Sequence, residues 1–430
     1  MNIVFLIMVG TAFAFAAWRE LTWLPVEGQS APMQALSTAM IQAASGAVEL
    51  AIGLVGVMTL FLGLMKVAEA GGLLAILARL IRPLMVRLFP DVPADHPAMG
   101  AMILNLSANA LGLGNAATPF GIRAMQELEK LNSRPGTATN AMALFLAINT
   151  SSVTLLPTGV IALRAAAGSA DPAGILPTTL FATIGSTTIA ILAAKLYRRM
   201  APVPSGAEQT TPAQEAPPHA DALAADNPQG AYPLWVSLTA LAGLAAAIPL
   251  AVLYGRSISP WIIPGLMVGF LAFGAMRRVR VYESMVEGGK EGFQVALRII
   301  PYLVAILVAV GMLRASGAMD ALVNLLTPLT GPLGLPGEAL PMALMRPLSG
   351  SGAYGILAAI INDPAVGPDS YTGYLVSTLQ GSTETTFYVL AIYFGAVQVR
   401  RIRHALAAAL TADVAGVVCA ILACLYLFGR

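Results

Sequence analysis

The sequence contains few charged residues, histidines and cysteines for its length of 430 residues. Lys, Arg, Asp and Glu together make up 11% of it, with 3 histidines and 2 cysteines. So little charge is untypical of a soluble globular protein, and no basic tract with interleaved aromatics indicates nucleic-acid binding. Cys419 and Cys424 do not show a metal-ligand pattern, and His96, His219 and His404 do not cluster. Neither a metal centre nor a catalytic histidine is expected.

Apolar residues take the place of the missing charge and make up 57% of the sequence. Runs of about 20 apolar residues match the hydrocarbon thickness of a bilayer, whereas buried helices of soluble proteins are usually shorter and one-sided. The sequence therefore predicts an all-α polytopic membrane protein. Residues 1–18 lack the basic n-region and cleavage site of a signal peptide, so we expect them to remain as a first helix.

One stretch interrupts the apolar pattern and divides the chain. Between residues 201 and 231 the sequence is rich in Pro, Ala, Glu, Gln and Asp and has almost no large apolar residue. Such a composition is typical of a solvated, flexible linker. The predicted domains are therefore residues 1–200, a cytoplasmic linker at 201–231, and residues 232–430.

The same order of elements is expected on both sides of the linker. Each half has an amphipathic stretch (73–89 and 319–329), then an apolar segment broken by Gly and polar residues (97–128 and 340–361), then two further spans. The broken segments are predicted to be re-entrant hairpins, which are tolerated at membrane depth only against protein or a water-filled cavity. An internal duplication is the economical explanation.

The positions of Lys and Arg predict how the halves are oriented. Basic clusters at 195–199, 277–280 and 400–403 fall on one side of a topology with nine full spans, and the positive-inside rule makes this side the cytoplasm. The N-terminus is then cytoplasmic, the C-terminus periplasmic, and the two hairpins enter from opposite sides. The halves are therefore predicted to be inverted repeats, as in many secondary transporters with broken helices near the midplane.

Two polar stretches at the centres of membrane-length runs define the candidate site. The first polar cassette, residues 147–154, lies inside the run 141–163, and the second polar cassette, residues 379–386, lies inside the run 371–397. The cassettes and the hairpins are expected to line a substrate- or ion-binding site. The candidate residues are Asn105, Asn109, Asn115, Thr118, Asn149, Ser151, Ser152, Thr154, Arg346, Ser349, Ser351, Gln380, Ser382, Thr383, Glu384 and Thr385.

Glu384 distinguishes the second cassette from the first, where its counterpart is Val153. A charged residue at the centre of a span is unfavourable by about 2.5–3.5 kcal/mol on insertion scales, so Glu384 is expected to face a cavity, titrate, bind a cation or pair. Arg346 could hold an anionic substrate or neutralise Glu384. The asparagines and hydroxyls could line the site, or they could join helices and cap half-helices.

Six motifs carry a family resemblance. The stretches DHPAMGAM (95–102), GLGNAATPFG (112–121) and NTSSVT (149–154) resemble bacterial spore maturation protein A. The stretches RIIPYLVA (298–305), RPLSGSGA (346–353) and QGSTETTFY (380–388) resemble spore maturation protein B. The resemblance covers nearly the whole chain outside the linker and implies a fusion of the two proteins, as found in bacteria that do not sporulate.

Both of these proteins carry the Gate, or nucleoside recognition, domain, which they share with concentrative nucleoside transporters and the membrane part of ferrous-iron transport protein B. The resemblance therefore implies a transport-type fold. It does not imply a nucleoside substrate, because the first hairpin has GNAATP at 114–119 and lacks an acid where nucleoside carriers usually have one.

We therefore expect an inner-membrane secondary transporter that moves a small polar or anionic solute by alternating access. H⁺ or Na⁺ would be the coupling ion, acting through Glu384, with no other cofactor. The alternative is a non-transporting scaffold or accessory protein in an envelope or spore-maturation-like process. An enzyme is not expected, because no second acid or histidine is identified near Glu384 at membrane depth. The expected partners are the solute, the lipid bilayer and further copies of the chain in a dimer or trimer, with no nucleic acid.

Overall fold

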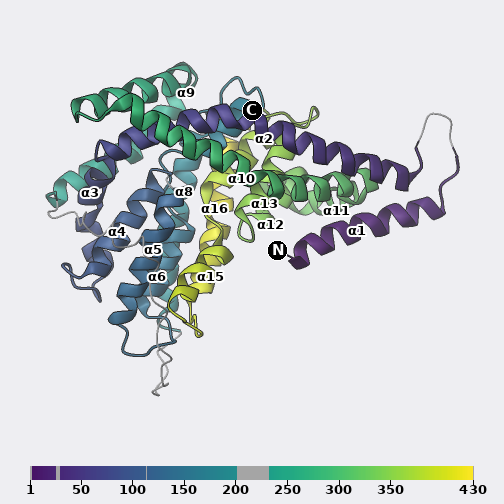
Figure 1. Cartoon of the computed structure of the whole chain (residues 1–430). Coiled ribbons are helices and arrows are strands. Elements are labelled where there is room, and N and C mark those ends of the chain that lie inside the picture. The colour runs from purple at the N-terminus through teal and green to yellow at the C-terminus, as the bar shows by residue number, and fades with distance from the viewer. Residues whose placement is uncertain (1, 26–29, 113, 201–231, 430) are drawn as a thin grey trace.

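The computed structural model describes residues 2–25, 30–112, 114–200 and 232–429 (Figure 1). These residues are nearly all helical, and the extended pairing found among them is a single bridge between Thr137 and Arg401. The predicted all-α fold is confirmed. The linker predicted at 201–231 lies outside the described residues.

The first half begins with two helices before its amphipathic segment. The second of them is a single helix of 39 residues that begins with a proline at its first position, where the fixed φ favours a helix. The elements of this half are α1 (Asn2–Leu21), α2 (Pro32–Ala70), α3 (Leu73–Leu88), α4 (Pro97–Ala110), α5 (Gly114–Lys130), α6 (Asn140–Thr150), α7 (Thr158–Ala166) and α8 (Leu176–Tyr197).

The second half repeats this order after a further long helix. Two long helices, of 43 and 36 residues, precede its amphipathic segment. The elements are α9 (Leu234–Met276), α10 (Val281–Ser316), α11 (Ala318–Thr330), the short turns η2 (Gly331–Leu333) and η3 (Gly337–Ala339), α12 (Leu340–Met345), α13 (Gly350–Ile361), α14 (Tyr371–Ser382), α15 (Thr386–Ala396) and α16 (Ala405–Phe428).

Both predicted hairpins are present, as α4 with α5 and as α12 with α13. The first turns at Gly112, whose φ of +75° is left-handed; a Cβ there would lie 2.5 Å from the carbonyl oxygen of Leu156. Only glycine satisfies both demands without strain. In the second hairpin, Ser349 begins α13 as its N-cap, because its hydroxyl accepts a hydrogen bond from the Gly352 N–H at 3.0 Å.

Fewer helices could cross a membrane alone than the nine spans predicted. Within the described part of the chain, α2, α8 and α16 are long and apolar enough, and a fourth candidate is a pair of segments, Leu303–Ser316 and Ala318–Leu333, bent by 81°. The runs that carry the polar cassettes are instead split into helices of 11 and 9 residues and of 12 and 11 residues. Each is about half the length that a membrane span requires.

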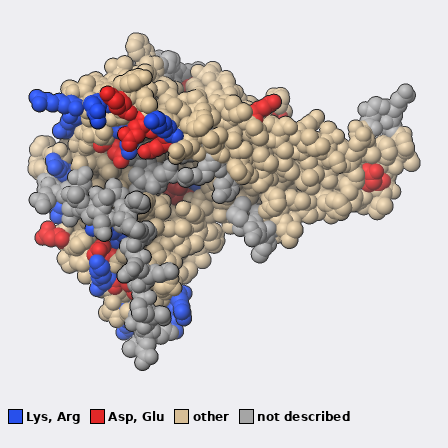
Figure 2. Space-filling model, in the orientation of Figure 1, with Lys and Arg blue, Asp and Glu red and all other residues tan. Residues whose placement is uncertain are grey.

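The two halves pack against each other over most of their lengths. Helix α2 lies along α10, and α16 packs against α6, α8 and α14. Figure 1 shows the blue helices α4, α5, α6 and α8 beside the yellow-green α15 and α16, while α1 and the adjoining part of α2 project from this body. Lys, Arg, Asp and Glu gather mainly on the body, and the projecting arm carries few of them (Figure 2).

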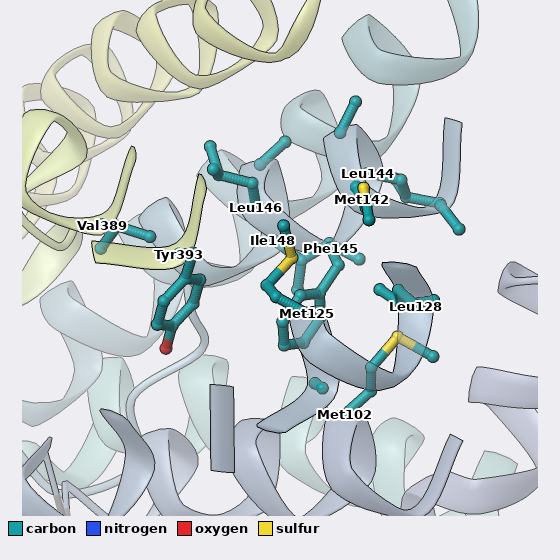
Figure 3. Packing of buried hydrophobic residues seen from close by; sticks show 14 of the residues in the cluster. Met102, Met125, Leu128, Met142, Leu144, Phe145, Leu146, Ile148, Val389 and Tyr393 are labelled. Carbon is teal, nitrogen blue, oxygen red and sulfur yellow. The ribbon is translucent and has the colours of Figure 1, made fainter. Parts of the chain in front are cut away.

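The buried apolar residues form clusters that draw on both halves. In the largest one, Tyr393 and Val389 of α15 face Met125 of α5 and Phe145 of α6 (Figure 3). The rings of Phe145 and Tyr393 are stacked, with their centroids 6.0 Å apart. Because each half completes the core of the other, the polar cassettes are brought together by the same packing.

Candidate functional site

Each polar cassette lies at a break between two helices. Helix α6 ends at Thr150 and α7 begins at Thr158, while α14 ends at Ser382 and α15 begins at Thr386. Hydroxyl groups at these ends bond back to the preceding turn: those of Thr150 and Ser151 donate to the Ala147 carbonyl, each at 2.9 Å. Such bonds compete with continuation of the helix, which gives a local reason for the break.

The two breaks meet through their backbones. The N–H of Glu384 donates to the carbonyl oxygen of Thr150 at 2.7 Å. Each hairpin is in turn bonded to the break of its own half, from the Leu155 N–H to the Ala110 oxygen at 2.9 Å and from the Phe387 N–H to the Pro347 oxygen at 3.1 Å. We call this meeting of the breaks (151–157 and 383–385) with the ends of α4 and α12 the central crossing.

Arg346 occupies the second-half side of the central crossing. Its side chain is 7% exposed and donates to the hydroxyl of Thr385 at 3.1 Å and to the carbonyl of Thr383. One of its nitrogens lies 3.6 Å from a carboxylate oxygen of Glu384, whose side chain is 49% exposed. The Glu384 charge also acts on Tyr354 of α13 and Tyr393 of α15. The two candidate residues thus form an ion pair of which Glu384 is the accessible member.

The first-half side of the central crossing is a closed hydrogen-bond network. Asn149 accepts from the Asn109 amide at 2.9 Å and from the Tyr393 hydroxyl at 3.4 Å. Asn105 donates to Tyr393 at 3.0 Å and to a backbone carbonyl of α5 at 2.7 Å. These amides join helices, as the alternative interpretation of the asparagines expected, and they do not cap them. One acceptor, the side-chain oxygen of Asn105, has no partner within the described residues.

Gln380 and Asn149 occupy matched positions but differ in their contacts. Both are buried, yet the side-chain oxygen of Gln380 has no hydrogen-bond partner among the described residues, whereas that of Asn149 has two. Beside Gln380, a Cβ on Gly381 would lie 2.8 Å from Thr179, so α14 approaches α8 closely here. The amide oxygen of Gln380 is therefore a buried acceptor without a protein partner among the described residues.

The remaining predicted site residues have fewer contacts that bear on the central crossing. The Ser382 hydroxyl bonds to its own helix at the Leu379 carbonyl, and Thr154 bonds to the Ser152 carbonyl at 3.3 Å. Ser152 is buried at the first break, and Ser349 is the cap described above. The others are Thr118 of α5 and Ser351 of α13, both half-buried, and Asn115 of α5, whose side chain lies outside the description.

Sequence reasoning missed an acid that lies beside the second break. Asp413 of α16 is 5% exposed, and one of its oxygens accepts from the Thr386 hydroxyl at 2.7 Å. The expectation that no second acid lies near the cassettes at membrane depth is therefore wrong. The signal was present, because Asp413 stands in the apolar run 405–428 much as Glu384 stands in its own.

A second missed group is Arg164 near the end of α7. It is fully buried, 3.0 Å from Asp369, and its guanidinium lies 4.2 Å from the centroid of the Tyr374 ring. It joins α7 to α14 and to the loop before α14, away from the central crossing.

Two cavities of about 220 Å³ each lie at the other end of α6, by its first residues. The first is lined in part by Arg87, Lys195 and Arg198, and the second by Arg134. Within the described ranges, no three His, Cys, Asp or Glu side chains are grouped as they would be to hold a metal ion. Of the charged side chains described above, Arg346, Glu384 and Asp413 lie at the central crossing.

Comparisons with known proteins agree with this architecture. The family model "Gate: Nucleoside recognition" matches residues 51–167 and 296–400. Spore maturation protein B of Bacillus subtilis (strain 168) is 48% identical over 168 residues, which is 39% of this chain and 93% of that protein. Spore maturation protein A of the same strain is 47% identical over 169 residues, which is 39% of this chain and 86% of that protein.

Weaker similarities were also found. Inner membrane protein YjiG of Escherichia coli (strain K12) is 29% identical over 103 residues, or 24% of this chain and 64% of YjiG. A solved structure of CNTnw in its intermediate 1 state is 15% identical, with a TM-score of 0.37 over 98% of this chain and 90% of the CNTnw chain. The family match contains both polar cassettes and covers more than half of the chain. This multi-pass membrane protein therefore belongs to the Gate, or nucleoside recognition, family.

Proposed function

We propose that the protein is an inner-membrane secondary transporter that moves a small polar or anionic solute by alternating access, coupled to H⁺ or Na⁺. Its halves would act as inverted repeats, with the N-terminus in the cytoplasm and the C-terminus in the periplasm. The solute would bind at the central crossing, where the Arg346–Glu384 pair and the amide of Gln380 supply charged and polar contacts. We propose no enzymatic reaction.

One observation carries this proposal: two broken helices meet at their breaks, and an ion pair lies at the meeting point. Broken helices at membrane depth expose backbone N–H and C=O groups, which persist only where protein or a water-filled cavity satisfies them. In secondary transporters such breaks bind the solute and the coupling ion, because the ends of half-helices carry partial charges. The exposure of Glu384 leaves one member of the pair able to face that cavity.

A second candidate function is a membrane scaffold that transports nothing. The closed network of Asn105, Asn109, Asn149 and Tyr393 favours it, because nearly all of these polar groups already have protein partners. In a scaffold the polar centre would hold the halves together while a surface engages another protein of the envelope. The similarity to two spore maturation proteins is compatible with such an accessory role.

Counterflow in proteoliposomes separates the two functions. Vesicles containing the protein would be loaded with one solute at a time from a panel of organic acids, amino acids, nucleosides and sugar phosphates. Exchange would be measured under a pH gradient and under a Na⁺ gradient. We expect saturable exchange of at least one solute and its loss in Glu384→Gln. The matched control is Glu291→Gln, because the Glu291 side chain is 54% exposed and lies 3.5 Å from Lys66. A folded protein that exchanges no solute under either gradient would favour the scaffold.

A further inference from the structure

We propose that Asp413, and not Glu384, is the group that takes up and releases the coupled proton. The proposal rests on the proposed transport function for its biological meaning. It identifies a titrating carboxyl that stands outside the two polar cassettes, on the last helix of the chain.

The burial of Asp413 makes its charged form unfavourable without a compensating partner. It lies in the interior of α16, a 24-residue apolar helix with a buried face. Thr386 donates to one carboxyl oxygen, but the other oxygen has no hydrogen-bond partner among the described residues. An ionised carboxylate in an apolar site is destabilised by several kcal/mol unless it is fully bonded. A bound proton neutralises the group and removes this penalty.

The surroundings also keep the ionised form within reach. Thr386 is the first residue of α15, so Asp413 lies at the N-terminus of that helix, where the backbone dipole favours a negative charge. The guanidinium of Arg346 acts on Asp413 electrostatically as well. Different neighbours thus stabilise the protonated and the ionised form of Asp413. A group that gains and loses a proton in every transport cycle requires both forms to be accessible.

Glu384 is less suited to this role, because its charge is already compensated. It is half exposed and lies beside Arg346, so the carboxylate has both water and a cation as partners. Asp413 has no ion pair within the described residues and is only 5% exposed. Protonation of Asp413 therefore changes its interaction with its surroundings strongly, whereas the surroundings of Glu384 suit contact with the solute.

The helices packed against α16 carry few other titratable groups among the described residues. Helix α6 has none, and the charged group that acts on Asp413 is Arg346. The neighbouring helices carry Lys195 and Tyr197 (α8), Tyr371 and Tyr374 (α14), and Tyr388 and Tyr393 (α15).

A change of charge at Asp413 has a direct route to the central crossing. One turn further along α16, Gly416 packs so closely that a Cβ there would lie 2.6 Å from the side chain of Thr383. The Thr383 carbonyl accepts from Arg346, which pairs with Glu384. When the carboxylic acid of Asp413 gives its proton to water, the new negative charge competes with Glu384 for Arg346. Release of the proton would therefore loosen the contact that closes the second break.

Infrared difference spectroscopy tests the assignment without requiring transport. The protein would be reconstituted in phosphatidylethanolamine–phosphatidylglycerol vesicles and titrated with acid in the absence of any solute. We expect a carboxylic-acid carbonyl band that appears on acidification, is lost in Asp413→Asn and persists in Glu384→Gln. A band that persists in Asp413→Asn, or that is lost in Glu384→Gln alone, would overturn the proposal. So would a band set by the Na⁺ concentration at fixed pH, because Asp413 would then be a sodium ligand.

A second variant covers the case in which Asp413→Asn does not fold. Thr386→Val keeps the carboxyl but removes the hydrogen bond to its ionised form, so the midpoint of the band should move to higher pH by about one unit. An unchanged midpoint would contradict the proposal. If the band behaves as expected and no solute is exchanged in any vesicle, the proton site stands and the transport function fails. If exchange occurs and the band is absent, the reverse holds.

Discussion

Arg346→Met and Glu384→Gln are expected to differ sharply in their effect on stability, although they break the same ion pair. The reason is the unequal burial of the partners, since the Arg346 side chain is 7% exposed and that of Glu384 is 49% exposed. Both substitutions keep the approximate volume of the side chain. Any difference between them therefore reports on hydrogen bonds and charge rather than on a cavity.

The magnitudes follow from the contacts of each residue. Arg346→Met leaves the Thr383 carbonyl and the Thr385 hydroxyl without their donor, and an unsatisfied buried polar group costs about 1–3 kcal/mol. We therefore expect a loss of about 2–5 kcal/mol in unfolding free energy. Glu384→Gln removes only a solvent-screened pair at 3.6 Å, for which about 0–1 kcal/mol is typical.

Thermal and denaturant unfolding in mild detergent would measure both effects, with Lys130→Met at an exposed pair as a control that should change little. A double-mutant cycle should give a coupling energy of about 1 kcal/mol or less, because the pair is half-solvated. The reasoning would be refuted if Glu384→Gln destabilised the protein as much as Arg346→Met. That outcome would mean that Glu384 is a buried partner and the central crossing is a packed network.

Three further predictions concern Gly121, Arg164 and His404. Gly121→Ala should lower the unfolding free energy by about 1–3 kcal/mol, since the added Cβ would overlap the Tyr393 hydroxyl. If the variant is as stable as the wild type, the prediction is wrong and the helices move apart without cost. Arg164→Met should cost about 3 kcal/mol by removing the buried partner of Asp369, and an unchanged melting temperature would contradict this. Burial, with two nearby arginines, lowers the pKa of His404 to about 4, so the stability gained from its neutral form is complete above about pH 6.5 and is lost as the pH falls toward 4. His404→Gln should flatten that part of the pH–stability profile, and an identical profile would exclude His404 as its cause.

The sequence predicted local interruptions better than long-range pairing. Gly112 and the hydroxyls of the cassettes carry their own conformational signals, so the hairpins and the polar centres of two runs could be located in advance. The contact between Tyr393 and Asn149 joins residues 244 positions apart and leaves no local pattern. Apolar length does not distinguish a straight helix from two half-helices, so run length alone could not locate the ends of α6, α7, α14 and α15.

Asp413 illustrates a different limit. Its residue type and its place in an apolar run were visible, and the argument that singled out Glu384 applies to it equally. What the sequence did not contain was the neighbour, because only the folded chain shows that α16 passes beside the second break. Composition thus reveals which polar residues are costly, and packing decides which of them meet.

The bond between the Glu384 N–H and the Thr150 carbonyl joins main-chain atoms, so it does not depend on which side chains stand at those two positions. Substitutions at Thr150 or Glu384 leave the carbonyl acceptor and the N–H donor in place, unless Glu384 is replaced by proline, which has no N–H. The backbone framework of the central crossing is therefore independent of the side chains that it presents. Related chains could exchange the side chains there, and with them the preferred solute, without losing the register between the two halves.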